Sequence, residues 1–380
     1  MKYKTYTVKD VKKASSENKF SVISCFAGGG GSSTGYRLAG GKILLINEFV
    51  EEAISSYKKN YPDTPVLVDD IKKYSGQDFL DKVKLKEGEL DILDGSPPCS
   101  AFSVAGKREK GWDKTKNYSD GKTVENIEDL FLDFIRVAKE IKPKVIVAEN
   151  VKGITFGEAT KKLNEFIKAF ESIGYYVTYK VLNAADFGVP QARERTIFIC
   201  VREDVADAIG LSFLNLVGIF PGEFGYQISM EDAIENIKND ENEIKELKEY
   251  YEGSFQKKFL DPIPFRPKRH MKPSDPEFRD WNPKASCFNM IRPCPTLPSP
   301  TLTQQGQKKG LSGVFHYADN RKLTIKELKR LMSLPEDYEL TGTFDQQAER
   351  IGRMVAPKMM AEVAKSIYEN VLKPYNEVTK

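Results

Sequence analysis

Histidine and cysteine are both scarce in this chain of 380 residues, and their scarcity limits the chemistry that it can perform. Neither of the two histidines, His270 and His316, lies near a cluster of cysteines. We therefore expect no metal site and no histidine general base. The five cysteines are scattered and odd in number, which is typical of a protein in a reducing cytoplasm rather than of a disulfide framework.

Long apolar segments and a strong net charge are also missing. No apolar run approaches membrane-spanning length, and the first residues, Met1-Lys2-Tyr3-Lys4, lack the apolar segment of a signal peptide. The formal net charge is only +3, so any surface for a nucleic acid must be a local basic patch. We expect a cytoplasmic protein with no membrane partner.

Short β-rich runs alternate with longer helical patterns from Phe20 to about Arg202. This alternation predicts an α/β fold with a doubly wound, mostly parallel sheet and helices on both faces. The expected strands cover residues 21–26, 42–46, 66–68, 90–93, 145–148, 176–182 and 196–201, and the clearest helices cover 33–38, 50–59, 127–140 and 159–172.

The sequence that follows, residues 203–320, is rich in proline, aromatic and basic residues and has little regular period. One charged helix is expected within it, at about 230–251. Such a stretch predicts a second, smaller domain built mostly from loops and short strands. Helical periodicity returns at 323–333 and 356–371, and residues 321–344 would form a connecting helix and hinge.

A cysteine follows two prolines at the end of a predicted buried strand, in Asp94-Gly95-Ser96-Pro97-Pro98-Cys99-Ser100. Pro97 and Pro98 fix two successive φ angles and remove two backbone donors. A free cysteine is usually a small buried hydrophobe. This stiff support is instead what a thiol needs if it must point in one direction, so Cys99 is a candidate nucleophile.

A carboxylate and two arginines follow on later strands. Glu149 ends the apolar run Val145–Ala148, and Arg193 and Arg195 alternate at the start of the run 196–201. The ends of neighbouring parallel strands meet at one edge of a sheet. Alternating residues of an extended segment share a face. We therefore expect a thiol, a carboxylate and a pair of guanidinium groups in one crevice.

Four glycines lie between the first predicted strand and the helix after it, in Phe26-Ala27-Gly28-Gly29-Gly30-Gly31. This pattern lets the backbone approach a ligand at a helix N-terminus, although a nucleotide oxidoreductase or a plain turn would look similar. Glu48 follows about twenty residues later, where such folds place an acid on ribose hydroxyls. Taken singly, Glu48 and Asp70 are better interpreted as ordinary acids at helix N-termini, which the helix dipole stabilises.

Blocks of sequence in a fixed order resemble the DNA (cytosine-5) methyltransferase family of bacterial and phage type, across nearly the whole chain. Besides the glycine run and Pro97-Pro98-Cys99, the blocks are Glu149-Asn150-Val151, Gln191-Ala192-Arg193-Glu194-Arg195, Ser299-Pro300-Thr301-Leu302-Thr303 and Arg350-Ile351-Gly352-Arg353-Met354-Val355-Ala356-Pro357. The resemblance implies a Rossmann-like domain that uses S-adenosylmethionine. This domain would comprise residues 1–202 and be completed by residues 345–380, while 203–320 would recognise the target.

The resemblance also implies a role for each site residue. Cys99 would attack C6 of a cytosine flipped out of double-stranded DNA, so that C5 accepts the methyl group. Glu149 would hold the N3 edge of the base, which requires a raised pKa, and Arg193 and Arg195 would contact the base, a phosphate or Glu149. The cofactor would be bound by Phe26, Gly28, Gly30, Glu48, Asp70, Ile71, Pro97, Arg353 and Val355.

Contacts with DNA are expected from two basic segments. The loop after Cys99 would close on the DNA through Ser103, Lys107 and Arg108. The run Arg266-Pro267-Lys268-Arg269, which contributes Arg266, Lys268 and Arg269, would contact phosphates, although a solvated face is equally consistent with any one of these side chains. The resemblance further implies a monomer with a cognate restriction endonuclease.

Two positions depart from the family pattern. Ser100 stands where the family usually has Gln, and Arg353 replaces the small Asn that closes the cofactor pocket. A guanidinium would repel a sulfonium, so we expect Arg353 to turn to solvent or to an acid. Alternatively, it reads a carboxylate on carboxy-S-adenosylmethionine, which would make the enzyme a carboxymethyltransferase. A tRNA cytosine-5 methyltransferase or a catalytically inactive DNA-binding relative would also be compatible with the sequence.

Overall fold

The structure is a computed structural model that describes residues 3–97, 116–117, 123–124, 129–212, 215–278, 290–310 and 313–379. The chain divides into two compact units, which we call the sheet unit and the loop-rich unit. The sheet unit comprises Lys9–Leu182, Glu194–Gly222 and Met360–Lys380, and the loop-rich unit comprises Met1–Val8, Asn183–Arg193 and Glu223–Met359.

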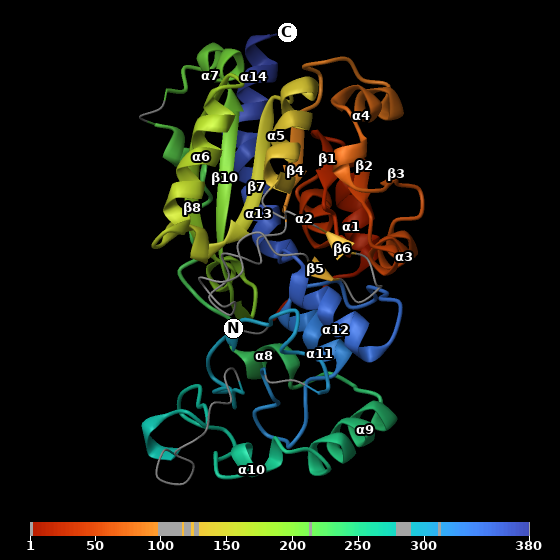
Figure 1. Ribbon diagram of the computed structural model, residues 1–380, viewed down its shortest axis with the longest axis vertical. Coiled ribbons are helices and arrows are strands. Elements are labelled where there is room, and N and C mark those ends of the chain that lie inside the picture. Colours follow the sequence, from red (N-terminus) through yellow and green to blue (C-terminus); the bar gives the residue numbers. More distant parts are fainter. Residues whose placement is uncertain are drawn as a thin grey trace. The chain divides into compact units, whose positions relative to one another are not determined.

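The sheet unit is built on seven strands in the order β3-β2-β1-β4-β7-β10-β8 (Figure 1). The pairs from β3 to β7 are parallel, and β10 runs antiparallel to β7. The strands are β1 (Ser21–Cys25), β2 (Lys42–Glu48), β3 (Val66–Val68), β4 (Ile92–Gly95), β7 (Val145–Val151), β8 (Tyr175–Asn183) and β10 (Glu194–Arg202). The predicted α/β class with a mostly parallel sheet is confirmed.

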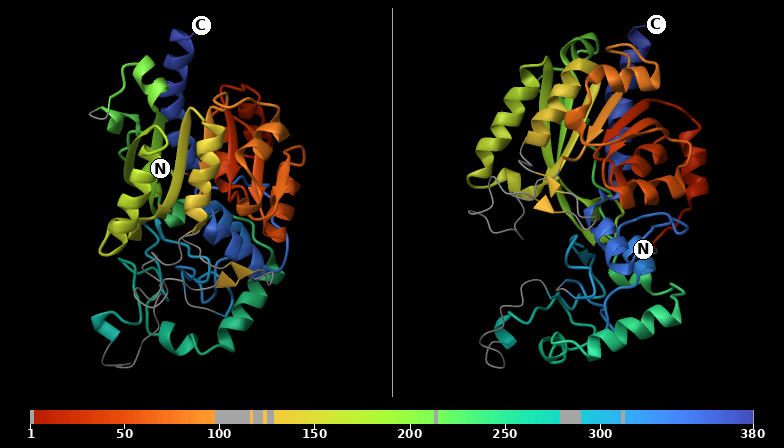
Figure 2. Two further views of the ribbon diagram at one scale, coloured as in Figure 1. Left: turned by 45° about the horizontal axis from the view of Figure 1, so that its top comes forward. Right: turned by 45° about the vertical axis from the view of Figure 1, so that its right-hand side comes forward.

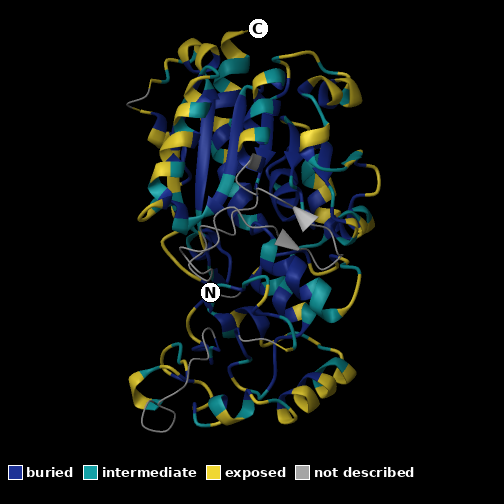
Figure 3. Ribbon diagram, in the orientation of Figure 1, coloured by how far each residue is buried: buried dark blue, intermediate teal, exposed yellow. Residues whose placement is uncertain are grey.

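Apolar runs explain why these segments form the central sheet. The inner strands are buried along nearly their whole length, as Figure 3 shows. Parallel strands covered on both faces require such continuous apolar sequence. On one face, Phe131 of α5 (Asp129–Ile141) stacks on Phe166 of α6 (Ala159–Glu171), with 3.7 Å between the ring centroids, and also meets Phe198 of β10.

Helices lie on both faces of this sheet. In Figures 1 and 2, α5 and α6 lie on one face, and the C-terminal helix α14 lies on the other. The remaining helices are α1 (Val8–Ser15), α2 (Gly31–Leu38), α3 (Glu51–Asn60), α4 (Gly76–Val83), α7 (Glu203–Ala208), α13 (Pro357–Ile367) and α14 (Lys373–Val378), with a π-helical turn at Tyr368–Leu372. The helix expected at 356–371 is α13, which this turn and α14 follow without a break, so helical structure extends to Val378.

The strand directions bring several strand ends to one edge of the sheet. Cys25, at the end of β1, pairs with Asn47 of β2 and Gly95 of β4, and Gly95 pairs in turn with Ala148 of β7. Because β10 is antiparallel, its first residues reach the same edge, where Arg195 pairs with Val151. This edge is where open α/β sheets bind their ligands.

The loop-rich unit has little regular structure. Its described elements are η4 (Ala184–Phe187), β9 (Gln191–Ala192), α8 (Met230–Ile234), α9 (Glu241–Glu252), α10 (Lys257–Leu260), η6 (Pro276–Phe278), β11 (Ser299–Pro300), α11 (Ile325–Leu331) and α12 (Phe344–Arg353). A small core of Tyr251, Leu260, Ile263, Met290 and Phe315 holds part of it together.

Two expectations about local structure need correction. The single charged helix expected at 230–251 is two helices, because the side chain of Asp240 caps a new N-terminus by accepting from the amides of Asn242 and Glu243. The segment after Cys99, expected to be loop throughout, contains a short antiparallel pair, β5 (Lys116–Asn117) with β6 (Thr123–Val124).

Candidate active site

The glycine turn after β1 has an unusual backbone. Phe26, Gly28 and Gly30 all have positive φ, at 53°, 53° and 90°. A positive φ is uncommon for a residue with a Cβ, and such strain is concentrated at functional sites. The turn is closed by the Gly30 amide, which donates to the Ala27 carbonyl at 3.0 Å, and α2 begins directly after it.

Glu48, at the end of β2, fixes this turn from the neighbouring strand. Its Oε2 accepts from the Gly28 amide at 2.7 Å, and its Oε1 accepts from the amides of Phe49 and Val50 at 2.9 Å each. Val50 is the residue before α3, so the carboxylate also lies at the N-terminus of that helix. Glu48 therefore joins two of the strand ends that were expected to contact the cofactor.

The other candidate cofactor residues of the sheet unit lie at the neighbouring strand ends. Asp70 follows β3 and caps the short helix Ile71–Lys73 by accepting from the Lys72 amide at 3.0 Å, and Ile71 is buried. Pro97 is buried just beyond β4. Ser96 before it donates to the Phe26 carbonyl at 3.4 Å, so the run after β4 contacts the glycine turn.

Glu149 and Arg195 form an ion pair at the same edge. Arg195 Nε lies 2.8 Å from Glu149 Oε1, and each side chain is only 13% exposed. Burial lowers the pKa of Arg195 below its ordinary value, whereas Glu149 opposes that change, so the guanidinium stays charged. The structure thus brings the predicted carboxylate together with one of the two predicted arginines.

Asp94 is a site residue that the sequence alone did not single out. Its side chain is buried at the end of β4, and its Oδ2 accepts from the hydroxyls of Ser24 and Ser32 at 2.7 and 2.8 Å. Oδ1 accepts from the Tyr36 hydroxyl at 3.1 Å. The signal in the sequence is an acid at the end of an apolar strand, with a serine, Ser24, in the strand beside it.

The candidate nucleophile Cys99 lies outside the described residues, as do Ser103, Lys107 and Arg108. Three other cysteines are described, namely Cys25, Cys200 and Cys294, and all are buried free thiols. Burial raises the pKa of Cys25 and of Cys200 well above the ordinary value. Those two thiols are therefore inert at neutral pH.

A family model agrees with this arrangement. The model described as C-5 cytosine-specific DNA methylase matches residues 20–369. The chain belongs to this family.

Several curated relatives of the methylase are bacterial enzymes. The Type II methyltransferase M1.HphI of Haemophilus parahaemolyticus is 32% identical over 352 residues, which are 91% of this chain and 86% of that protein. The Type II methyltransferase M.NgoFVII of Neisseria gonorrhoeae is 30% identical over 359 residues, or 93% of this chain and 87% of that protein. The chain is therefore an enzyme of the DNA cytosine-5 methyltransferase class.

Solved structures share the fold of the methylase. A prophage-encoded protein of Escherichia coli, described as a DNA modification methyltransferase, has a TM-score of 0.67 at 20% identity and covers 93% of this chain and 99% of its own. The Dnmt2 methyltransferase of S. pombe has a TM-score of 0.58 at 17% identity, over 94% of this chain and 99% of its own. At these identities the likeness concerns the fold alone.

Arg193 of the methylase is bonded within the loop-rich unit, whereas Arg195 pairs with Glu149 in the sheet unit. Its side chain is 2% exposed inside the loop-rich unit. Nη1 donates to the Leu302 carbonyl at 2.9 Å, and Nη2 donates to the carbonyls of Gly352 and Met354 at 3.0 and 2.9 Å. The expected pairing of the arginines assumed one continuous strand, but the chain is interrupted at Arg193, between β9 and β10.

Arg353 is also engaged within the loop-rich unit. It forms an ion pair with Glu349, one turn earlier on α12, and Lys308 Nζ lies 2.6 Å from the same carboxylate. These cations lower the pKa of Glu349, against the effect of its burial. Val355 is buried nearby in sequence. Arg353, the residue that departs from the family pattern, thus points to an acid, Glu349.

The basic run in the loop-rich unit is largely paired with acids. Arg266 forms an ion pair with Glu231, and Arg269 Nη1 lies 2.7 Å from Asp275. Lys268 is exposed, and within the described part of the chain it has no ion-pair partner. Lys268 is thus the side chain of this run that is best placed to meet a phosphate.

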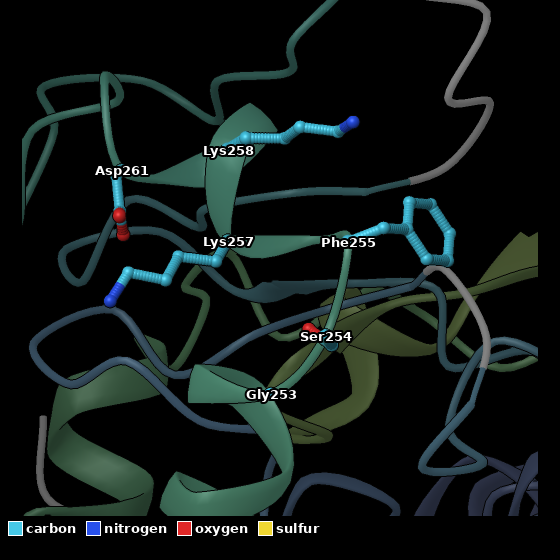
Figure 4. A pocket seen from close by; sticks show the side chains of 6 residues that line it. All are labelled: Gly253, Ser254, Phe255, Lys257, Lys258 and Asp261. Carbon is cyan, nitrogen blue, oxygen red and sulfur yellow. The ribbon is translucent and has the colours of Figure 1, made fainter.

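A shallow hollow of about 470 Å³ lies beside α10 in the same unit (Figure 4). Lys257 and Lys258 point in opposite directions from it, and Lys257 is paired with Glu252. Phe255 projects on the side of Lys258 and is 59% exposed. The hollow joins a cation and an aromatic ring, a combination that suits a nucleic acid.

Membrane-spanning helices and metal clusters are both missing from the described residues. No helix among them is both long and apolar enough to cross a membrane. Nor do these residues contain a group of three or more histidine, cysteine or acidic side chains arranged to hold a metal ion.

Proposed function

We propose that this methylase transfers a methyl group from S-adenosylmethionine to C5 of a cytosine flipped out of double-stranded DNA, through a covalent bond between Cys99 and C6. The observation that carries the proposal is the ion pair of Glu149 with Arg195 at the sheet edge where the glycine turn also lies. A base bound there would meet a carboxylate whose orientation is already fixed. Glu149 then hydrogen-bonds the N3 and amino edge of the cytosine, and Arg195 holds Glu149 in place.

The cofactor is supported by the backbone of the sheet unit. The glycine turn has no Cβ at Gly28 and Gly30, so a ligand can approach its backbone closely. Oε1 of Glu48 already accepts from two amides, but Oε2 accepts only from the Gly28 amide and keeps an acceptor site, with which it accepts a ribose hydroxyl. Bound S-adenosylmethionine supplies an electrophilic methyl group.

The chain itself supplies the nucleophile, Cys99. The Cys99 thiolate adds to C6, and the electron pair of the C5–C6 bond becomes available at C5 for the methyl group. After transfer, the C5 proton leaves to a base and the C5–C6 double bond reforms as the Cys99 thiolate departs. The inertness of Cys25 and Cys200 supports Cys99 in this role.

Two finer assignments concern DNA and its protection. Residues 203–320 would recognise the target sequence, with Lys268 and Lys258 on phosphates. By similarity to Type II methyltransferases, we infer a monomeric enzyme that protects DNA against a cognate restriction endonuclease.

Carboxymethyl transfer is the second candidate. Lys308 and Arg353 both lie against Glu349, and a guanidinium beside the donor would match a carboxylate on the donor's transferable group. We place this candidate second, because the ion pair with Glu349 already explains the orientation of Arg353.

One experiment separates these candidates. The protein is incubated with either S-adenosylmethionine or carboxy-S-adenosylmethionine and with either duplex DNA or tRNA, and the nucleosides are identified by mass after digestion. We expect 5-methylcytosine in DNA. Carboxymethylcytosine would establish the second candidate, a product in tRNA alone would establish an RNA substrate, and no product with any combination would indicate an inactive relative.

A further inference from the structure

Asp94 holds together the two ends of the glycine turn. Ser24 lies before the turn on β1, whereas Ser32 and Tyr36 lie after it on α2, and all three hydroxyls donate to the same carboxylate. Because a carboxylate has only acceptor sites, it orients all three hydroxyl protons toward itself. The turn between these anchors contains the strained Phe26 and the cofactor glycines.

The end of β4 is held on its other face as well. Asp94 faces α2, and Gly95, the next residue, faces α5, where a Cβ would lie 2.5 Å from the Phe134 ring. Ser96 then donates to the Phe26 carbonyl. The strand end that leads to Pro97-Pro98-Cys99 is therefore fixed to the glycine turn through consecutive residues.

We propose that Asp94 is a positioning residue for donor binding, whose ionised carboxylate keeps the glycine turn and α2 in place against the end of β4. The inference rests on the proposed use of S-adenosylmethionine. Asp94 does not touch the donor itself. It acts through the backbone of the turn, which the donor contacts.

The charge of Asp94 is costly where it lies, which indicates that the fold does not retain it for stability. Burial raises its pKa to about 6, against the opposing effect of the three hydroxyl donors, and the charge of Glu149 adds to the rise. On the elements packed around it, the charged or titratable groups are Cys25 on β1, Tyr36 on α2 and Glu149 on β7 with its partner Arg195. Burial keeps the Cys25 thiol and the Tyr36 phenol protonated, by raising the pKa of each well above its ordinary value.

The chain offers a matched control at the other end of the same strand. Asp91, directly before β4, accepts from the amide and hydroxyl of Ser21 at 2.8 Å each and pairs with Lys144 at 2.6 Å. Like Asp94, it is an aspartate with several hydrogen bonds, but it is only partly buried and lies at the strand end away from the turn. Asp91→Asn should lower the melting temperature and leave donor affinity unchanged.

The test is calorimetric titration of S-adenosylmethionine into wild type, Asp94→Asn and Asp91→Asn, each with its melting temperature. Asp94→Asn should melt no lower than wild type at about pH 7.5 and bind the donor about tenfold more weakly, the value of roughly one charge-assisted hydrogen bond. At about pH 5 wild-type Asp94 is itself mostly protonated, so the affinity ratio should approach one.

Four outcomes would overturn the inference, and the last of them would also overturn the proposed function. Equal affinity of wild type and Asp94→Asn at about pH 7.5 would do so, as would a ratio that does not change between the two pH values. A loss of affinity that merely follows a lower melting temperature would show an ordinary structural role. Wild type that does not bind S-adenosylmethionine at all would contradict the proposed function, and the role of Asp94 would fall with it.

Discussion

Replacing Arg193 by methionine should destabilise the loop-rich unit rather than disable the chemistry directly. Methionine keeps the apolar stem of the side chain but removes the guanidinium, so the carbonyls of Leu302, Gly352 and Met354 lose a donor. The Gly352 and Met354 carbonyls lie at the C-terminal end of α12, where helix carbonyls lack intrahelical partners and favour a cation. Arg193 thus caps this helix from a distant part of the chain.

The magnitude follows from the burial of the site. Leaving one buried acceptor unsatisfied costs about 1–3 kcal/mol, and the three losses share one side chain, so we expect about 4 kcal/mol in total. Hydrogen exchange followed by mass spectrometry measures this loss locally. Peptides covering 299–310 and 344–356 should lose protection, while peptides from β1 and β4 should keep it.

Arg195→Met is the matched comparison for this prediction. It removes the same group two residues later, where the partner is Glu149 and the surroundings are the sheet edge. It should lower turnover strongly and leave exchange in 299–310 and 344–356 unchanged. The reasoning is refuted if Arg193→Met keeps wild-type protection and loses turnover as Arg195→Met does, because Arg193 would then contact the substrate.

Three further predictions concern charge. Burial raises the pKa of Asp94 from 3.8 to about 6, so its contribution to stability is present below pH 3.8 and lost as the pH rises through about 6. Asp94→Asn should therefore be more stable than wild type at about pH 7.5, by an amount on the order of 3 kcal/mol at most. Chemical denaturation at about pH 4 should show no such gain. An equal gain at both pH values would contradict the direction of the pKa shift. Lys268→Ala should make the plot of log binding constant against log salt for duplex DNA less steep, by about one unit of slope, and an unchanged slope would mean that Lys268 meets no phosphate. Arg353→Asn should leave the ratio of rates with S-adenosylmethionine and carboxy-S-adenosylmethionine unchanged, because Glu349 already engages Arg353, and a shift of about tenfold or more would show that Arg353 reads a donor carboxylate.

The sequence predicted the sheet well because its strands are continuous apolar runs. The run at 145–148 became β7, and the polar residues directly after it, Glu149 and Asn150, still belong to the strand. Pairing with β10 extends β7 beyond the apolar residues, since backbone hydrogen bonds do not depend on side-chain polarity. Glu149 and the glycine turn lie at the same edge of the sheet because their strands are parallel. The alternation of strands and helices in the sequence already indicated parallel strands.

Residues that act through distant contacts could not be found in the same way. The acceptors of Arg193 lie more than one hundred residues away in the sequence, at Leu302 and Gly352, and no local period reveals them. The carboxylate of Asp94 is likewise defined by Ser24, Ser32 and Tyr36, which lie 58 to 70 residues earlier. Only the tertiary fold shows that the first arginine is a helix cap and that Asp94 anchors a turn.

The most direct test of the proposed mechanism is whether Cys99 bonds to the target base. Wild type is incubated with S-adenosylmethionine and duplex DNA in which the target cytosines carry fluorine at C5, which blocks the final elimination. The masses of the intact products are then measured by mass spectrometry. We predict a protein–DNA adduct whose DNA remnant maps to Cys99 after digestion, and no adduct for Cys99→Ser, which should still bind S-adenosylmethionine as wild type does. Methylation of ordinary DNA at a near-normal rate by Cys99→Ser, or an adduct at another residue, would contradict the mechanism.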